Sequence, residues 1–168
     1  KIELSEVSFE YQAGEPILTN INLRFHKGER IGFVGESGSG KTTLASIMLG
    51  LLDPTTGQVL YEGKDVSKLS GSQYRDFRKN VQAVFQDPFA SLNPRIKVGD
   101  IIAQGPLIQG MSKVEAESLA KELISVVGLD EKAYERFPHE FSGGQRQRIG
   151  IARSLAVKPE ILIADEPV

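Results

Sequence analysis

Hydrophobic and polar residues alternate over the first part of the chain. Val7, Phe9 and Tyr11 fall on one side of an extended segment, and the same period of two recurs over residues 21–25. This period is typical of strands that bury one face. A further short run at residues 59–61 follows turn residues and indicates a hairpin. The pattern therefore predicts antiparallel strands near the N-terminus.

Two short runs are continuously hydrophobic, at residues 31–34 and 161–164. Such runs are typical of strands covered on both faces, as in a parallel sheet flanked by helices. We therefore predict two buried core strands, one early in the chain and one at its end.

Helical spacing of hydrophobic residues occurs in three segments, over about 42–49, 116–127 and 145–156. Ser112 and Glu115 stand three apart before the second segment, which is the spacing of a capping box. Strands thus come first, a mainly helical region follows, and a core strand closes the chain. A helical insertion within a parallel α/β core is the simplest architecture for this order.

Composition narrows the function. The 168 residues are 40% hydrophobic and carry a net charge of -2. That length suits one domain. Because no block of Lys and Arg stands out, nucleic acid is a poor candidate for the main ligand. The absence of cysteine excludes disulfides and thiolate metal sites.

A glycine-rich stretch between residues 31–34 and the first helical segment matches the phosphate-loop pattern G-x-x-x-x-G-K-S/T. Its backbone N–H groups and the start of the next helix attract phosphate oxygens. Lys41 is expected to reach the β- and γ-phosphates, and the Thr42 hydroxyl to ligate Mg²⁺. The predicted nucleotide-binding residues are Gly35, Glu36, Ser37, Gly38, Ser39, Gly40, Lys41, Thr42 and Thr43.

Asp165 and Glu166 follow the run at 161–164 directly. Ligands of open α/β sheets bind at the carboxyl ends of strands, so Asp165 is expected to hold the metal, directly or through water. Glu166 is expected to polarise an attacking water as general base. Taken alone, the pair also fits a strand that ends in two solvated acids.

The run Ser142, Gly143, Gly144 and Gln145 precedes the third helical segment. Ser with Gln three residues later is a capping box, and a glycine-rich helix start is also an anion site. On these residues alone, the structural and the binding interpretations both stay open.

The order of these motifs resembles that of the ATP-binding subunits of ABC transporters, from Val7 to the end of the chain. Residues 7–11 resemble the segment whose aromatic, here Tyr11, stacks on adenine. Gln86 resembles the glutamine of the Q-loop, and residues 141–145 resemble the signature loop.

This resemblance implies a P-loop NTPase core of the α/β class, with a RecA-like parallel sheet, N-terminal antiparallel strands and a helical insertion. It implies a single domain that lacks the C-terminal part of the family fold. We expect a nucleotide-binding core over 1–86, a helical subdomain over 87–157 and the Walker B strand over 158–168. We also expect residues 1–168 by themselves to hydrolyse little or no ATP.

The resemblance also implies ATP and Mg²⁺ as cofactors, with Lys41, Gln86 and Glu166 as catalytic residues. Metal contacts would come from Thr42, Gln86 and Asp165. Ser142 and Gly144 would clamp the γ-phosphate held by an opposing subunit, with Gly143 and Gln145 in the same loop. His139 precedes the signature, whereas the family's switch histidine follows the Asp-Glu pair, so His139 is expected to be structural or interfacial.

Residues 85–94 and 137–140 are similar to the oligopeptide and dipeptide importer branch, which includes nickel and glutathione importers. That branch implies a second ATPase subunit in a homo- or heterodimer, transmembrane permease subunits and, indirectly, an extracytoplasmic solute-binding protein. It places the subunit on the cytoplasmic face of the membrane and implies no nucleic-acid partner. The alternatives are a soluble ABC ATPase of DNA repair or translation, or a catalytically inactive nucleotide-binding fragment.

Overall fold

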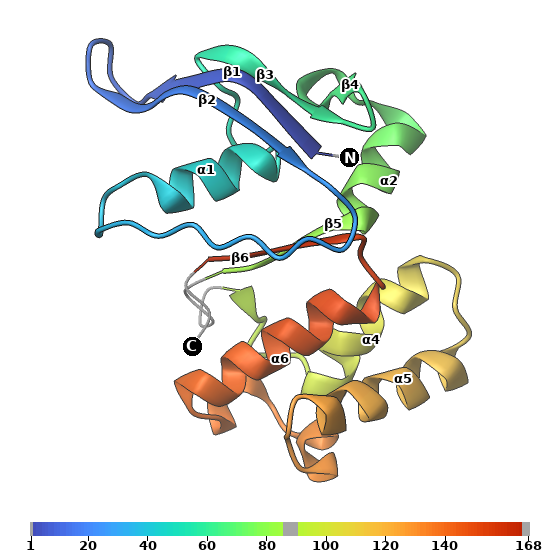
Figure 1. Cartoon of the computed structure of the whole chain (residues 1–168). Coiled ribbons are helices and arrows are strands. Elements are labelled where there is room, and N and C mark those ends of the chain that lie inside the picture. The colour runs from blue at the N-terminus through green and yellow to red at the C-terminus, as the bar shows by residue number, and fades with distance from the viewer. Residues whose placement is uncertain (1, 86–90, 166–168) are drawn as a thin grey trace. The chain divides into compact units, whose positions relative to one another are not determined.

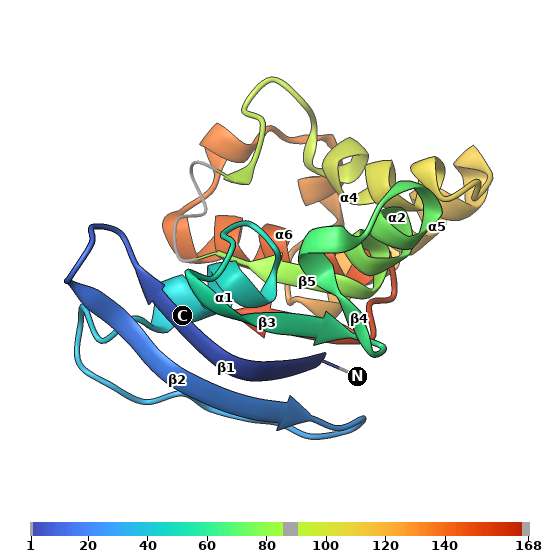
Figure 2. The ribbon, with the colours of Figure 1, turned by 90° about the horizontal axis from the view of Figure 1, so that it is seen from above.

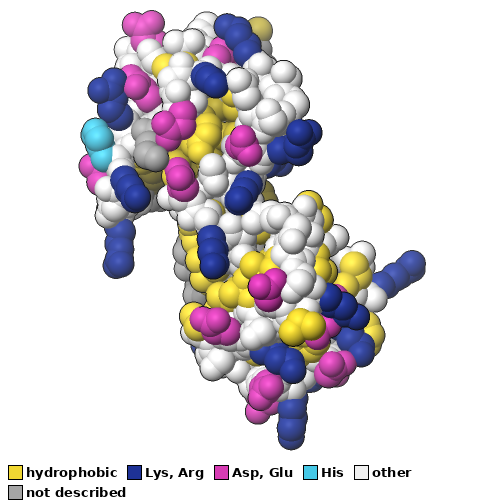
Figure 3. Space-filling view, turned by 90° about the vertical axis from the view of Figure 1, so that its right-hand side faces the viewer, with side chains coloured by type: hydrophobic (Ala, Val, Ile, Leu, Met, Phe, Trp, Pro, Cys, Tyr) yellow, Lys and Arg dark blue, Asp and Glu magenta, His cyan; other side chains and the backbone are white. Residues whose placement is uncertain are grey.

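The computed structural model describes residues 2–85 and 91–165 of the chain (Figure 1). It consists of two compact units, residues 1–81 and 82–168, here called unit 1 and unit 2. The predicted boundaries after residues 86 and 157 stay predictions. None of the helices in the described ranges has the length and hydrophobicity needed to span a membrane. On the face seen in Figure 3, acidic and basic side chains are interspersed.

Unit 1 is built on a four-stranded antiparallel sheet with the order β2-β1-β3-β4. Its strands are β1 (Ile2–Glu10), β2 (Pro16–Phe25), β3 (Thr56–Tyr61) and β4 (Lys64–Asp65). Helix α1 (Lys41–Met48) lies on one side of this sheet (Figures 1 and 2). The predicted N-terminal strands and hairpin are therefore confirmed.

The buried positions of β1 change parity within the strand. Ile2 and Leu4 are buried, and so are Val7 and Phe9. The register shifts between Leu4 and Val7, and Glu6 has a φ of 53°. An irregularity of this kind inserts an extra residue into the strand, so that both pairs can face the core despite the odd spacing between them.

The predicted strand at residues 31–34 is wrong. These residues have no regular secondary structure, and Ile31, Phe33 and Val34 are 49%, 41% and 101% exposed. A strand needs a neighbour to satisfy its backbone groups. In the described part of unit 1, every ladder forms among β1 to β4, and none includes residues 31–34. Hydrophobicity alone does not supply the missing partner.

Helix α2 (Gly71–Asn80) follows the single turn η1 (Val66–Lys68) and was not expected from the sequence. Phe77 is its one buried residue among those described, and the ring packs on Tyr61 with 5.3 Å between centroids. Because a single buried side chain leaves no hydrophobic stripe, the helical period is not visible in the sequence.

A two-stranded parallel sheet is formed by β5 (Val81–Val84), which lies in unit 2 apart from its first residue, and β6 (Ile161–Ala164). Strand β6 lies where the sequence predicts it. Its expected burial on both faces is wrong, however, because Leu162 is 40% exposed. Among the described strands β6 pairs with β5 alone, so one of its edges has no neighbouring strand.

The core of unit 2 lies among its helices. They are α4 (Val98–Ile108), α5 (Lys113–Val126) and α6 (Gly143–Ala156), with the short turns η2 (Glu131–Glu135) and η3 (Pro138–Glu140). Their apolar faces share one hydrophobic cluster, which includes Ile102, Ala120, Ile124, Ile149 and Ala152. The second and third helical segments predicted from the sequence are thereby confirmed.

The capping box of α5 is also confirmed. The Ser112 hydroxyl oxygen accepts from the Glu115 N–H at 3.3 Å, and the Glu115 carboxylate accepts from the Ser112 N–H at 3.1 Å. Hydrogen bonds from the Ser112 hydroxyl and the Ser112 N–H lower the pKa of Glu115 from its usual value. The box thus ties together the first turn of the helix.

Gly57 tests the close approach of β3 to β1. Its φ is +81°, and a Cβ on it would lie 2.4 Å from the Glu6 carbonyl oxygen. The change Gly57→Ala combines left-handed strain of roughly 1–2 kcal/mol with this clash. In the control Gly63→Ala, φ is +75° and the added Cβ meets nothing within 4 Å. Urea unfolding should show a larger loss for Gly57→Ala, by about 1 kcal/mol or more. Equal losses would contradict the clash.

Ser112→Ala tests the capping box. Loss of the cap should lower the free energy of unfolding by about 1 kcal/mol. The control Ser125→Ala makes the same exchange at an exposed site in the last turn of α5, and should stay within about 0.5 kcal/mol of the parent.

The capping box should also make stability depend on pH. Because the folded state lowers the pKa of Glu115, the contribution of the Glu115 carboxylate to stability is complete above the usual carboxyl pKa. It is lost as the pH falls through the lowered value. The effect of Ser112→Ala should therefore shrink in acid; an unchanged difference would argue against the box.

Candidate functional site

The predicted phosphate loop leads directly into α1. Gly40 is the N-cap residue of this helix and has a φ of 89°, and Gly38 has a φ of 84°. Backbone in this region favours glycine, because a Cβ there crowds the following carbonyl. An acidic residue in the first turn would neutralise the positive end of the helix dipole, and this helix has none there. The loop and the helix start thus form an arrangement suited to an anion.

Lys41 closes the loop. Its Nζ atom donates to the Gly35 carbonyl at 2.8 Å and to the Glu36 carbonyl at 2.9 Å. The Lys41 side chain thereby reaches from the first residue of α1 back to the start of the loop. A positive charge held at this position is available to oxygens of a bound phosphate.

Tyr11 lies next to the helix that follows the phosphate loop, although 32 residues separate it from Thr43. Tyr11 is 64% exposed, and its ring and that of Phe9 are at 88° to each other, with 4.8 Å between centroids. Its hydroxyl lies 3.4 Å from the Thr43 hydroxyl. The exposed ring is thus fixed by Phe9 and at its hydroxyl.

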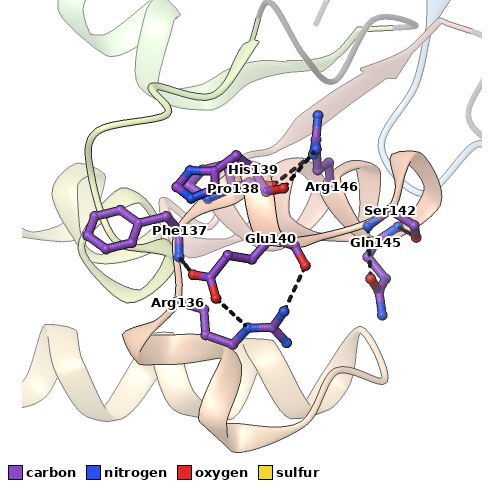
Figure 4. Close-up of polar contacts among 8 residues, drawn as sticks. All are labelled: Arg136, Phe137, Pro138, His139, Glu140, Ser142, Gln145 and Arg146. Atoms are coloured by element: carbon purple, nitrogen blue, oxygen red, sulfur yellow. Dashed lines mark hydrogen bonds and ion pairs between the residues drawn. The ribbon is translucent and has the colours of Figure 1, made fainter.

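Ser142 is the N-cap of α6, and the predicted capping box is present (Figure 4). The Ser142 hydroxyl oxygen accepts from the Gln145 N–H at 3.3 Å, and the Gln145 side chain accepts from the Ser142 N–H at 3.0 Å. A Cβ placed on Gly143 or Gly144 would meet nothing within 4 Å. The glycine backbone at this helix start is therefore open to a partner.

Helix α6 is anchored behind this loop. The Ser154 hydroxyl donates to the Ala83 carbonyl of β5 at 2.9 Å, and Arg153 donates to the Ser91 carbonyl. Burial lowers the pKa of Arg153 from its usual range. The signature-like loop thus begins a helix that is fixed to the strand of its own unit.

Asp165 follows β6 and is buried, at 8% exposure. Its N–H donates to the Val84 carbonyl at 2.9 Å, so it continues the pairing of β6 with β5. No group of three or more metal-binding side chains occurs within 2–85 and 91–165.

The structure places the predicted residues in two sets. Tyr11, residues 35–42 and Thr43 belong to unit 1, and residues 142–145 and Asp165 belong to unit 2. Gln86 and Glu166 lie outside the described residues. His139 stacks on Phe137, with 5.8 Å between ring centroids, and its structural or interfacial role stays a prediction.

Three charged residues beside the signature-like loop were given no individual role from the sequence, although residues 137–140 were matched to the importer branch. Arg136, Glu140 and Arg146 hold the turn η3 through hydrogen bonds to its backbone (Figure 4). Their position on either side of the loop was the only sign of a role that the sequence offered. Their hydrogen bonds depend on the geometry of the turn, which the sequence does not show.

Comparison with known proteins identifies the family. The model of the ABC transporter family matches residues 18–168. The dipeptide transport ATP-binding protein DppF of Lactococcus lactis subsp. cremoris is 48% identical over 175 residues, which cover 99% of this chain and 56% of that protein. The oligopeptide transport ATP-binding protein OppF of Streptococcus mutans is 47% identical over 173 residues, with the same coverage. The chain spans about half the length of the curated relatives it matches.

Solved structures agree with this result. A dimeric ATP-binding cassette, MJ0796, in a post-hydrolysis state bound to ADP and Pi, aligns with a TM-score of 0.88 and 33% identity. The alignment covers 100% of this chain and 75% of that one. CbiO1 from Clostridium perfringens aligns with a TM-score of 0.82 and 28% identity, over 99% of this chain and 65% of that one. The predicted fold class is confirmed, and the chain belongs to the ABC transporter family.

Proposed function

We propose that this chain forms the ATP-binding and ATP-hydrolysing part of the motor subunit of an ABC importer for oligopeptides or dipeptides. The observation that carries the proposal is the phosphate loop, where Lys41 spans a loop with left-handed glycines at the start of α1. The peptide class rests on the names of the relatives at 47–48% identity.

In unit 1, Tyr11 binds the adenine of the nucleotide, and the phosphate loop binds its phosphates. The adenine stacks on the exposed ring of Tyr11, which contributes about 1–3 kcal/mol by analogy with other base–aromatic stacking. The phosphates take hydrogen bonds from the backbone of the loop at residues 35–40 and from Thr43. Lys41 exchanges the Gly35 and Glu36 carbonyls for oxygens of the β- and γ-phosphates.

Hydrolysis is an in-line attack of water on the γ-phosphate. Glu166 accepts the proton of the attacking water as general base, and Lys41 stabilises charge on the transferred group. The residues proposed to hold Mg²⁺ are Thr42, Gln86 and Asp165. When bound, the ion neutralises charge on the β- and γ-phosphate oxygens.

The signature-like loop acts on a second subunit. In the proposed head-to-tail dimer, homo- or heteromeric, Ser142 and Gly144 bind the γ-phosphate of the ATP held by the partner. Closure of the dimer drives transmembrane permease subunits, which receive solute from an extracytoplasmic binding protein, and hydrolysis resets them. The subunit then works at the cytoplasmic face of the membrane as a peripheral protein.

Lys41→Ala tests the phosphate site. Hydrogen bonds to charged groups contribute about 1.5–3 kcal/mol, so affinity for ATP should fall roughly 10- to 100-fold. The measurement is titration with a fluorescent ATP analogue. The control Lys68→Ala removes an exposed lysine of the same unit that pairs with Asp65, and should leave affinity unchanged. Equal affinity of the Lys41→Ala variant and the parent would refute the site.

Glu166→Gln tests the general base in the full-length protein. The amide keeps the size of the side chain but cannot accept the proton, so turnover should fall by about 10²–10⁴. Affinity for ATP should stay near that of the parent. Phosphate release at saturating ATP measures the effect, and Glu122→Gln on α5 is the control for loss of one carboxylate. Turnover like that of the parent would show that another group is the base.

A further inference from the structure

The turn before the signature-like loop is held by arginines from both sides. From α6, the Arg146 Nε donates to the Pro138 carbonyl at 2.8 Å and its Nη2 to the His139 carbonyl at 3.3 Å. From the other side, the Arg136 Nη2 donates to the Glu140 carbonyl at 2.7 Å. Three consecutive carbonyls of η3 thus accept from guanidinium groups (Figure 4).

The Glu140 carboxylate closes the same turn. One oxygen accepts from the Phe137 N–H at 2.6 Å, and the other accepts from the Arg136 Nε at 3.3 Å. The Phe137 N–H and the Arg136 guanidinium lower the pKa of Glu140 from its usual value. Glu140 is therefore ionised at neutral pH. We call the contacts of Arg136 and Glu140 with the turn η3 the clamp.

Arg136 also connects the turn to the hydrophobic core of unit 2. Its guanidinium lies over the ring of Phe141, 4.4 Å from the centroid, and Phe141 is 5% exposed. Ser142, the cap of α6, follows directly. The position of Ser142 is thus fixed through Phe141 on one side and through the helix on the other.

The glycines of the loop have no such support of their own. A Cβ at Gly143 or Gly144 would have no atom within 4 Å, so no neighbouring group packs closely where a side chain would begin. Their position has to come from the helix that they start and from the turn that precedes them. Arg136 and Glu140 are the side chains that close this turn upstream.

We propose that Arg136 and Glu140 are positioning residues for the signature-like loop. By fixing residues 138–140, they hold Ser142 and Gly144 in the arrangement that binds the γ-phosphate on a second ATPase subunit. This inference rests on the proposed function, because it presumes that the loop serves a partner's ATP.

A positioning role and a role in stability predict effects of different size when Arg136 or Glu140 is changed. The Arg136 and Glu140 side chains are 45% and 36% exposed, and exposed ion pairs contribute little to folding. A small misplacement of a group that binds the reacting phosphate, in contrast, can cost about 10²-fold in rate. Loss of the clamp should therefore weaken ATP-driven dimerisation of the subunits much more than it lowers the stability of the fold.

The experiment compares Arg136→Lys and Glu140→Gln with the parent, all in a full-length Glu166→Gln background and with the partner ATPase subunit if the pair is heteromeric. Arg136→Lys keeps the charge but loses the planar fork of donors. Glu140→Gln keeps the shape but loses the charge. The control Glu135→Gln breaks the exposed pair of Glu135 with Lys97, at 2.7 Å in the same unit.

Three quantities are measured: ATP affinity of the separated subunit, ATP-driven dimerisation by light scattering, and Tm. For both variants we expect ATP affinity within twofold of the parent, Tm close to that of the parent, and at least a fivefold higher ATP concentration for half-maximal dimerisation. Glu135→Gln should match the parent in all three.

Two results overturn the inference. One is dimerisation of both variants at the parent's ATP concentration. The other is a joint fall of Tm, ATP affinity and dimerisation, which indicates a structural role only. A parent that binds no ATP, or that does not dimerise with it, overturns the proposed function and the inference together.

Discussion

The two glycine-rich helix starts depend on one constraint: the carbonyl groups of the turns beside them need hydrogen-bond partners. The structure meets this constraint similarly at two places. In unit 1, Lys41 donates to the carbonyls of Gly35 and Glu36. In unit 2, Arg136 and Arg146 donate to the carbonyls of η3. In both cases a cationic side chain satisfies the carbonyls beside a glycine-rich helix start, and its charge adds to the positive end of the helix.

The helices behind these loops give them fixed positions. Helix α6 buries Ile149 and Ala152 in the helical core and is tied to β5 through Ser154. In α1, Leu44 and Ile47 are buried on the apolar face. Sites supported by packed helices are held more precisely than sites on free loops. The glycines can therefore be exposed without being displaced.

Local features were predictable from the sequence, and features that need a distant partner were not. Both capping boxes were visible because their donors and acceptors lie three residues apart. The strand at residues 31–34 was misjudged because pairing depends on a neighbour that no local pattern reveals. The exposure of Leu162 has the same cause. The positions of the proposed site residues were predicted from motif spacing, whereas the contacts of Arg136 and Glu140 depend on the shape of a turn.

The two interpretations of the run at residues 142–145, helix cap and anion site, are compatible at the level of single atoms. The capping box uses the N–H of Ser142, which donates to Gln145, and the N–H of Gln145, which donates to Ser142. It does not use the N–H groups of Gly143 and Gly144, which belong to the first turn and have no intrahelical acceptor. The Ser142 hydroxyl, while accepting from Gln145, still has its own proton to donate. The cap therefore fixes the helix start and leaves two backbone donors and one hydroxyl donor for a phosphate.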